Sequence, residues 1–493
     1  MRILVLQLAR FGDIFITWPT LRALRRRYPG AEIHLVVRQR FRAAAGDCEA
    51  IDKLWCLDTA QILEPLLTDQ GDVDVSLVRL TEWTELLSEQ DFDLVINLSF
   101  SPFSSYLTSL VSHGNAVVRG YTRYSDGFLA IPDDTSAYFY AQVGVGLSNR
   151  YHLAEVFAAV ADVELSGADW NLPMTWHAQE RLVGWQEKQP ELAGDYILFH
   201  LGASQAEKIY PAFKWHRVIL ELQRRWPAQI VLIGSASEQN MAEAVLGAGG
   251  CGSVLNLVGK TDFSDVGALI AGAQVLIGAD SAPMHLAGFT ATPCLNLSFA
   301  AVNFWETGPR TLGSRILVAD SPADLPSDRV VAEILAMLKN QSSQRPVVYR
   351  RSHQPVGYEW QVAEDNNQSW RMIQAIYSGG EWPEVHDPII VKALWQMREA
   401  VNVAITQIPN LRNVEKRRLA NGLIEQADLA IYALRRVVPE LRPLVSWFET
   451  ERLRLGPMDL ESLIARTGDI YGQLLGVLNL YLLPIDQQRE AEP

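Results

Sequence analysis

The sequence lacks several features that would assign it to common classes of protein. It contains no run of about 18 apolar residues without charge, so we expect no membrane-spanning segment. Its first residues enter an apolar run at once, without the layout of a signal peptide, which predicts a cytoplasmic protein. The formal net charge of −14 argues against non-specific binding to the phosphate backbone of nucleic acids, so we expect no nucleic-acid partner.

Cysteine is scarce, and the sequence contains no cluster of metal-ligating residues. The four cysteines, Cys48, Cys56, Cys251 and Cys294, form no Cys-x-x-Cys pair, which is typical of a reducing compartment and predicts no metal site.

Residues 6–13 lack the Gly-x-Gly-x-x-Gly pattern that brings a backbone close to a pyrophosphate. A nicotinamide-dependent dehydrogenase is therefore disfavoured.

Short apolar runs alternate with amphipathic stretches over residues 1–340. The chain length of 493 residues suits two or three domains, and a hydrophobic content of 48% lets each domain bury a core. Alternating strands and helices predict parallel sheets joined by crossover helices, and thus an α/β fold. The strands are expected at residues 3–8, 33–37, 54–57, 94–98, 117–121, 197–201, 230–233, 254–258, 275–277, 294–297 and 316–318.

Two such alternating series predict two Rossmann-like domains, at residues 1–172 and 190–340. In open parallel sheets, ligands bind outside the carboxyl ends of the strands. Asp13, Ser204 and Asp280 each follow a predicted strand, so we expect them to converge on a cleft between the domains.

The pattern changes beyond residue 340. Residues 341–386 are interpreted as a linker followed by a Trp-rich segment of ambiguous structure. Over residues 387–483, apolar residues recur at helical spacing without strands between them, which predicts a helical bundle. Most of these residues should form its core, although some could present a surface for a protein partner or for self-association.

The segment 278–286, Gly-Ala-Asp-Ser-Ala-Pro-Met-His-Leu, follows a predicted strand. Ser281 can cap a helix there, and Pro283 suits the first helical turn. A strand that ends in an acid, a hydroxyl and a helix N-terminus is suited to hold a sugar and a pyrophosphate. An ordinary capped helix with a half-buried His285 would explain the same pattern, so the interpretation depends on the rest of the chain.

Two other segments support the functional interpretation. The first predicted strand runs into a loop that ends in Gly12 and Asp13, and residues 208–215 read Lys-Ile-Tyr-Pro-Ala-Phe-Lys-Trp after another predicted strand. Taken in order, the three segments resemble glycosyltransferase family 9, the bacterial ADP-heptose:lipopolysaccharide heptosyltransferases. The resemblance covers roughly residues 1–340. It implies the GT-B architecture, in which two Rossmann-like domains enclose the ligand cleft, here followed by an additional all-α region.

The resemblance also implies a reaction. A sugar, plausibly a heptose, would move with inversion from a nucleotide diphosphate, most simply ADP, to a glycolipid or glycan acceptor of the lipopolysaccharide type. Asp13 would be the general base, a role that contributes about 10²–10⁴ in rate, although an isolated Gly-Asp pair can equally cap a helix. No cofactor or metal is implied, because the nucleotide sugar is a substrate and lysine and helix N-termini replace a divalent ion.

The family's donor-binding residues can be carried over by position. Lys208 and Ser204 would contact the diphosphate, and Asp280 would hold sugar hydroxyls. Glu238 lies near the position of an acid that contacts the ribose, but it equally suits a plain helix start. Without the neighbouring residues of the motif, Lys208 would be interpreted as a solvated surface lysine. The complete predicted donor set is Ser204, Lys208, Glu238, Asp280, Ser281, Ala282 and His285.

Two residues depart from the family pattern. Ala282 stands where a glycine is usual, and Tyr210 replaces a tryptophan. If position 282 needs a positive φ angle, alanine is strained there and the loop differs. Both departures favour an alternative, a non-catalytic binding or assembly module that acts through its helical C-terminal region.

Arg38, Arg40 and Arg42 follow the second predicted strand on the expected cleft side. They could receive a phosphorylated or carboxylated glycolipid acceptor, and a solvated basic surface is the open alternative. Such an acceptor would bring a cytoplasmic enzyme to the inner face of the inner membrane as a peripheral protein.

Overall fold

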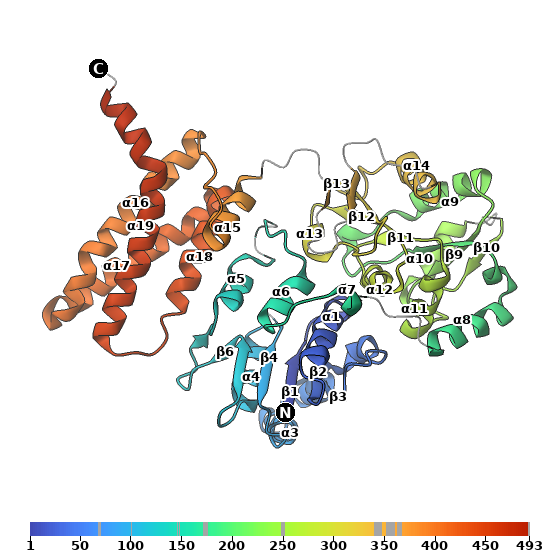
Figure 1. Ribbon diagram of the computed structural model, residues 1–493, viewed down its shortest axis with the longest axis horizontal. Helices are drawn as coiled ribbons and strands as arrows, with labels where there is room; N and C mark the ends of the chain where they lie inside the picture. Colours follow the sequence, from blue (N-terminus) through green and yellow to red (C-terminus); the bar gives the residue numbers. More distant parts are fainter. Residues whose placement is uncertain are drawn as a thin grey trace. The chain divides into compact units, whose positions relative to one another are not determined.

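The computed structural model in Figure 1 describes residues 1–67, 71–99, 101–144, 146, 148–170, 176–247, 252–339, 348–351, 360–361 and 367–491. Cys251 and parts of the predicted linker and Trp-rich segment, at residues 341–347, 352–359 and 362–366, lie outside these residues. The chain forms two compact units. The first unit comprises Met1–Leu80 and Tyr151–Asp365, and the second comprises Thr81–Arg150 and Asn366–Pro493.

The first unit begins with three parallel strands, β1 (Arg2–Leu6), β2 (Glu32–Arg38) and β3 (Lys53–Leu57). Their apolar runs are buried almost without interruption, as expected for parallel strands covered on both faces. Helix α1 (Phe11–Arg27) connects β1 to β2 and buries every residue from Ile14 to Leu21. Since the middle of α1 is buried on all sides, the helix is held firmly at the end of β1.

The second sheet of the first unit has the strand order β10-β9-β8-β11-β12-β13-β14-β15. The first five pairings are parallel, and the last two are antiparallel. The chain leaves β8 towards one edge of the sheet and returns at β11 towards the other, so the strand order reverses between these neighbours. Such a switch point is where open α/β sheets bind ligands. The strands are β8 (Tyr196–His200), β9 (Gln229–Ile233), β10 (Val254–Asn256), β11 (Val275–Ala279), β12 (Cys294–Phe299), β13 (Arg315–Ala319), β14 (Val348–Arg351) and β15 (Trp360–Gln361).

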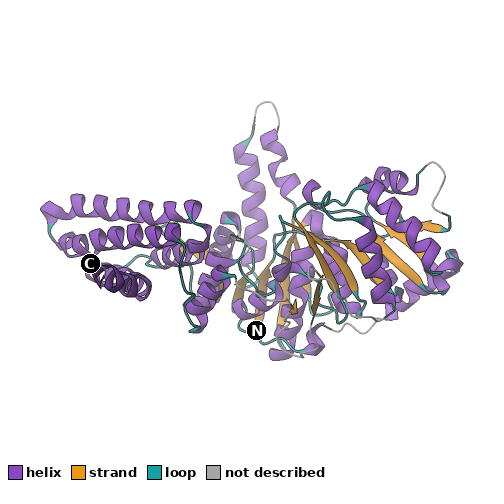
Figure 2. Cartoon of the chain, turned by 90° about the horizontal axis from the view of Figure 1, so that it is seen from above, coloured by secondary structure: helices purple, strands orange, loops and turns teal. Residues whose placement is uncertain are grey.

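Helices lie on both faces of this sheet, as Figure 2 shows for the orange strands between purple helices. The core between them contains large side chains such as Phe199, Trp215 and Leu232, all fully buried. Trp215 is therefore a core residue. The covering helices are α8 (Trp176–Lys188), α9 (Ala212–Arg225), α10 (Gln239–Leu246), α11 (Phe263–Gly272), α12 (Ala282–Thr290) and α14 (Ser327–Leu338).

The second unit contains two parallel strands, β4 (Leu94–Asn97) and β5 (Val117–Gly120), with helix α4 (Pro102–Val111) between them in sequence. A short antiparallel hairpin of β6 (Thr122–Arg123) and β7 (Leu129–Ala130) follows. With these strands, every strand that the sequence predicted is present, whereas β6, β7, β14 and β15 were not predicted.

The helical bundle predicted for the C-terminal region is present in the second unit, drawn in orange and red in Figure 1. Leu394, Phe448 and Leu474 are fully buried in its core. Helix α5 (Asp134–Gln142) belongs to the same unit, because the side chain of Gln142 donates to the carbonyl of Pro443 at 3.1 Å. Within the described residues, no helix has the length and apolarity needed to cross a membrane. The helices of the C-terminal region are α15 (Gln368–Ser378), α16 (Pro388–Gln407), α17 (Val414–Val437), α18 (Arg442–Leu453) and α19 (Leu460–Ala491).

Candidate active site

A cavity of about 840 Å³ lies in the first unit, where the loops after β1, β8, β9 and β11 meet. The N-terminal ends of α1, α11 and α12 also border it. Its lining includes Asp13, Arg40 and the whole predicted donor set: Ser204, Lys208, Glu238, Asp280, Ser281, Ala282 and His285. Arg38 and Arg42 are not among its lining residues. The loops thus bring together side chains from positions almost 300 residues apart in the chain.

Asp13 occupies the third position of α1, and its Oδ2 accepts a hydrogen bond from the backbone N–H of Arg10 at 3.0 Å. The carboxylate therefore satisfies its own helix end as well as facing the cavity. Burial raises the pKa of Asp13, and nearby Asp280 adds to this effect. The N–H and the charge of Arg10 oppose it. A carboxylate with a raised pKa is a stronger base near neutral pH than an exposed aspartate.

Gly12 is needed for space and not for a tight turn. Its φ is not positive, so no left-handed backbone conformation requires glycine here. A Cβ at position 12 would lie 3.0 Å from Cδ2 and 3.1 Å from Nε2 of His285, so glycine lets this imidazole pack directly on α1. Burial lowers the pKa of His285, Asp280 opposes this, and Lys208 adds a lowering effect that is smaller than that of Asp280. The imidazole is therefore neutral at neutral pH.

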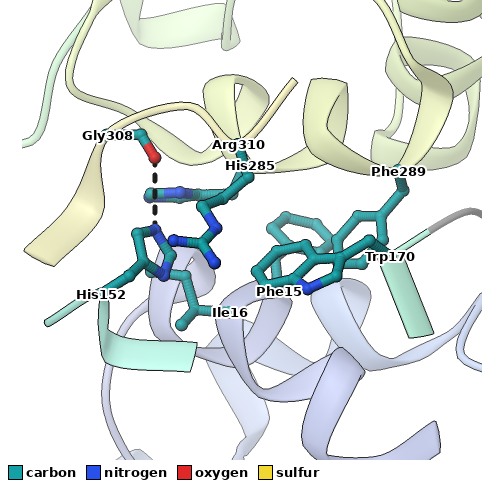
Figure 3. A pocket seen from close by; sticks show the side chains of 8 residues that line it. All are labelled: Phe15, Ile16, His152, Trp170, His285, Phe289, Gly308 and Arg310. Atoms are coloured by element: carbon teal, nitrogen blue, oxygen red, sulfur yellow. Dashed lines mark hydrogen bonds between the residues drawn. The ribbon is translucent and has the colours of Figure 1, made fainter. Parts of the chain in front are cut away.

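A small chamber lies behind His285, lined by aromatic and basic side chains (Figure 3). His152 donates from Nε2 to the carbonyl of Gly308 at 3.2 Å. Arg310 donates to Oε1 of Glu155 at 2.7 Å and lies over the ring of Trp170 at 4.9 Å. These contacts fix the 308–310 segment to the start of helix α6 (Leu153–Val160).

Thr307, directly before this segment, places its hydroxyl against Asp280. Thr307 donates from Oγ1 to Oδ1 of Asp280 at 2.8 Å, and Lys208 donates from Nζ to Oδ2 at 2.8 Å. The side chains of Lys208 and Asp280 are each only 12% exposed, so Lys208 is not a freely solvated surface lysine. Asp280 is thereby oriented at the end of β11, with an ammonium group beside it in the cavity.

Ser281 stands at the N-cap position of α12, but its side chain does not cap the helix. Its Oγ lies 3.1 Å from Nδ1 of His200 instead, which leaves the start of the helix open to a ligand. Ala282 is the first residue of α12 and has no positive φ. The strain that was considered for alanine at this position is therefore absent.

Glu238 completes a capping box and also lines the cavity. Its Oε2 accepts hydrogen bonds from the backbone N–H and the hydroxyl of Ser235, at 2.5 and 3.1 Å, as in a capping box. The same carboxylate lies on two glycines. A Cβ would come within 1.2 Å of Oε1 at Gly202 and within 2.5 Å of Oε2 at Gly234. The two glycines therefore make room for the carboxylate at the cavity.

Tyr210 fits the position of the usual tryptophan. Its ring packs edge-on against Trp215 at 4.8 Å, and its hydroxyl donates to the carbonyl of Leu325 at 3.0 Å. With neither Tyr210 nor Ala282 strained, the two departures from the family pattern no longer favour a module without catalysis.

Sequence reasoning missed several lining residues. Arg10 donates from NH1 to Oγ of Ser204 at 3.3 Å across the cavity. Phe263 packs its ring against Phe11 at 4.7 Å and Phe15 at 5.4 Å, which closes an apolar wall between α1 and α11. Arg10 could have been noticed as a basic residue directly before the Gly-Asp pair, whereas nothing local signals Phe263. Among the described residues, no group of three or more potential metal ligands is found.

Comparison with known proteins identifies what the chain is similar to. Residues 81–323 match the family described as glycosyltransferase family 9 (heptosyltransferase). The chain is 26% identical over 311 residues to lipopolysaccharide heptosyltransferase 3 of Escherichia coli K12, covering 60% of this chain and 82% of that protein.

Solved structures show the same fold over the α/β part of the chain. A family 9 glycosyltransferase from Veillonella parvula aligns with a TM-score of 0.57 at 18% identity, over 69% of this chain and 98% of the other. The E. coli heptosyltransferase WaaC, solved with ADP, aligns with a TM-score of 0.52 at 18% identity, over 68% of this chain and the whole of the other. These likenesses confirm the GT-B architecture, and the bundle confirms the additional all-α region. Over residues 81–323 the chain therefore matches glycosyltransferase family 9, and it is a glycosyltransferase.

Proposed function

We propose that this glycosyltransferase moves a heptose from an ADP-linked donor to a lipopolysaccharide-type or other cell-envelope glycan, with inversion at the anomeric carbon. The name of the E. coli relative and the ADP in the WaaC structure support the sugar, the nucleotide and the acceptor class. The observation that carries the proposal is that Asp13 and the Lys208–Asp280 pair line one cavity. Asp13 is suited to accept a proton, and the Lys208–Asp280 pair is suited to bind the charged nucleotide-sugar donor.

Asp13 is proposed as the general base. It would take the proton of the acceptor hydroxyl as the oxygen attacks the anomeric carbon from the face opposite the diphosphate, which inverts that centre. Its Oδ2 is held by the N–H of Arg10, and the carboxylate lines the cavity, where an acceptor hydroxyl can reach it. The raised pKa of Asp13 strengthens it as a base.

The opposite wall is proposed to bind the donor. Lys208, Ser204 and the uncapped start of α12 would stabilise the charge that gathers on the leaving diphosphate. Each charge-assisted contact of this kind contributes about 1.5–3 kcal/mol. Because an ammonium group and a helix N-terminus supply positive charge here, we propose that the transfer needs no divalent ion. Asp280, held by Thr307, would accept hydrogen bonds from sugar hydroxyls.

Arg40 is proposed to meet the acceptor. It lines the cavity and lies over the ring of Phe41 at 4.5 Å, and Arg38 and Arg42 flank it in sequence. Three guanidinium groups in one short segment suit a phosphorylated or carboxylated saccharide. Acyl chains anchor a glycolipid acceptor in a bilayer, so we propose that the enzyme works in the cytoplasm at the inner face of the inner membrane.

A panel of nucleotides tests the proposed function. A nucleoside diphosphate at 100 times its dissociation constant should stabilise the folded protein by about 2.7 kcal/mol. We expect ADP to raise the melting temperature more than UDP or GDP, with free nucleosides as controls. If no nucleotide raises it, the chain is the non-catalytic binding module instead.

Glu238 is proposed to accept hydrogen bonds from the ribose hydroxyls, and Gly202 allows a specific test. In the Gly202→Ala variant the new Cβ would fall 1.2 Å from the present position of Oε1, so the carboxylate must leave. We expect affinity for ADP, measured by calorimetry, to fall about tenfold, as for the loss of a hydrogen bond to a charged group. Gly194→Ala is the matched control, because a Cβ at that position meets nothing within 4 Å. Unchanged affinity in Gly202→Ala would remove Glu238 from the donor site.

A further inference from the structure

We propose that the guanidinium group of Arg10 binds the diphosphate of the donor together with Ser204. This inference rests on the proposed function and extends it to a residue outside the predicted donor set. Arg10 directly precedes α1 and lines the cavity. Its NH1 already donates to Oγ of Ser204 at 3.3 Å, so the side chain reaches from the loop after β1 to the loop after β8. A hydroxyl and a guanidinium side by side form a donor pair for phosphate oxygens.

The charges around the cavity leave Arg10 available for an anion. Lys208 is already paired with Asp280 at 2.8 Å. The lining carboxylate of Asp262 is paired with Arg181 at 3.3 Å. Among the described residues, no carboxylate side chain forms an ion pair with Arg10, whose main-chain N–H, not its guanidinium, holds Asp13. A bound diphosphate would supply the anionic partner for this guanidinium.

The contact with Ser204 indicates that Arg10 binds the donor and not the acceptor. Arg40 also lines the cavity, but its guanidinium lies over Phe41, which belongs to the segment after β2. Arg10 instead points to the loop after β8, on the same side as Lys208 and the start of α12. The geometry therefore assigns Arg10 to the diphosphate and not to an anionic acceptor.

Arg10 would also link donor binding to the base. Its backbone N–H fixes Oδ2 of Asp13 at 3.0 Å, while its positive charge lowers the pKa of Asp13. A diphosphate bound to the guanidinium neutralises that charge. The pKa of Asp13 then rises, and the carboxylate becomes a stronger base once the donor is in place.

Calorimetric titration with ADP tests the proposal on the full-length protein. We expect Arg10→Gln to weaken ADP binding by about ten- to a hundred-fold, the loss of a charge-assisted hydrogen bond. Arg10→Lys should recover much of the affinity, because it keeps the charge. Arg224→Gln is the matched control, since Arg224 is an exposed arginine near the end of α9 that does not line the cavity. Melting temperatures without ligand establish that each variant folds.

The outcomes separate this inference from the proposed function. If the wild-type protein binds ADP and Arg10→Gln binds it equally well, Arg10 is not a diphosphate ligand, even if turnover falls. If the wild-type protein binds no nucleoside diphosphate, the proposed function fails and takes the inference with it.

The pH dependence of kcat/KM gives a second readout that a merely structural arginine would not change. Loss of the positive charge in Arg10→Gln lets the pKa of Asp13 rise in the free enzyme, so the acid limb should move to higher pH. An acid limb that stays in place, with kcat/KM lowered equally at all pH values, would contradict the electrostatic link.

Discussion

Turnover of the Asp13→Asn variant is expected to fall by about 10²–10⁴-fold, the usual contribution of a general base. The asparagine amide cannot take the acceptor proton, but its carbonyl oxygen can still accept the N–H of Arg10 that holds Asp13 in place. The start of α1 should therefore stay folded, and affinity for ADP should remain close to the wild-type value. Steady-state kinetics with donor and acceptor, together with calorimetry of ADP, measure the two effects separately.

The pH profile adds a directional test. Asp13 acts in its deprotonated form, and burial raises its pKa. The wild-type kcat/KM should therefore fall with decreasing pH at a higher pH than an exposed aspartate would allow. Asp47→Asn, at an exposed position outside the cavity, serves as the control and should keep wild-type turnover. Normal turnover by Asp13→Asn would mean that another group takes the proton.

The largest effect on stability is expected at a buried ion pair under the second sheet. Arg315 in β13 donates from NH1 to Oε2 of Glu333 in α14 at 2.9 Å, and the two side chains are 2% and 4% exposed. Glu333→Ala leaves a guanidinium buried without its carboxylate. This change should lower the free energy of unfolding by about 3–5 kcal/mol. Denaturant unfolding, followed by a probe in the first unit, measures the loss.

A double variant distinguishes the pair from ordinary packing. Arg315→Met combined with Glu333→Leu replaces both charges with apolar side chains and should restore most of the lost stability. If Glu333→Ala lowered the free energy of unfolding by only about 1 kcal/mol or less, as for a surface ion pair, the pair would be solvated in solution.

The α/β part of the fold could be predicted because its signals are local. Buried parallel strands are continuous apolar runs, so β8, β9 and β11 stand out in the sequence without any knowledge of their neighbours. By contrast, β15 comprises only Trp360 and Gln361, and a pair of residues carries no periodicity. The packing of α5 against the bundle includes a hydrogen bond between Gln142 and Pro443, 301 residues apart, which no local pattern records.

The site was predictable only in part, for a similar reason. Asp13 and Asp280 follow strong strand signals, so their place at the cavity follows from the topology of parallel sheets. Arg38 ends β2 and Arg42 lies in the 3₁₀ helix that follows it, but neither lines the cavity, because this helix brings only Arg40 of the three to it. Ser281 occupies a capping position, yet its side chain contacts His200 of β8, a buried partner from a distant strand that no local pattern indicates.

Residue order along the chain was sufficient to place polar groups at strand ends and to show that strands and helices alternate, because both depend on neighbours a few positions apart. Folding in three dimensions settled the rest. The space for Glu238 over Gly202, the packing of His285 on Gly12 and the raised pKa of Asp13 all arise from groups that are distant in sequence. Close packing and burial are properties of the assembled core, and no single segment contains them.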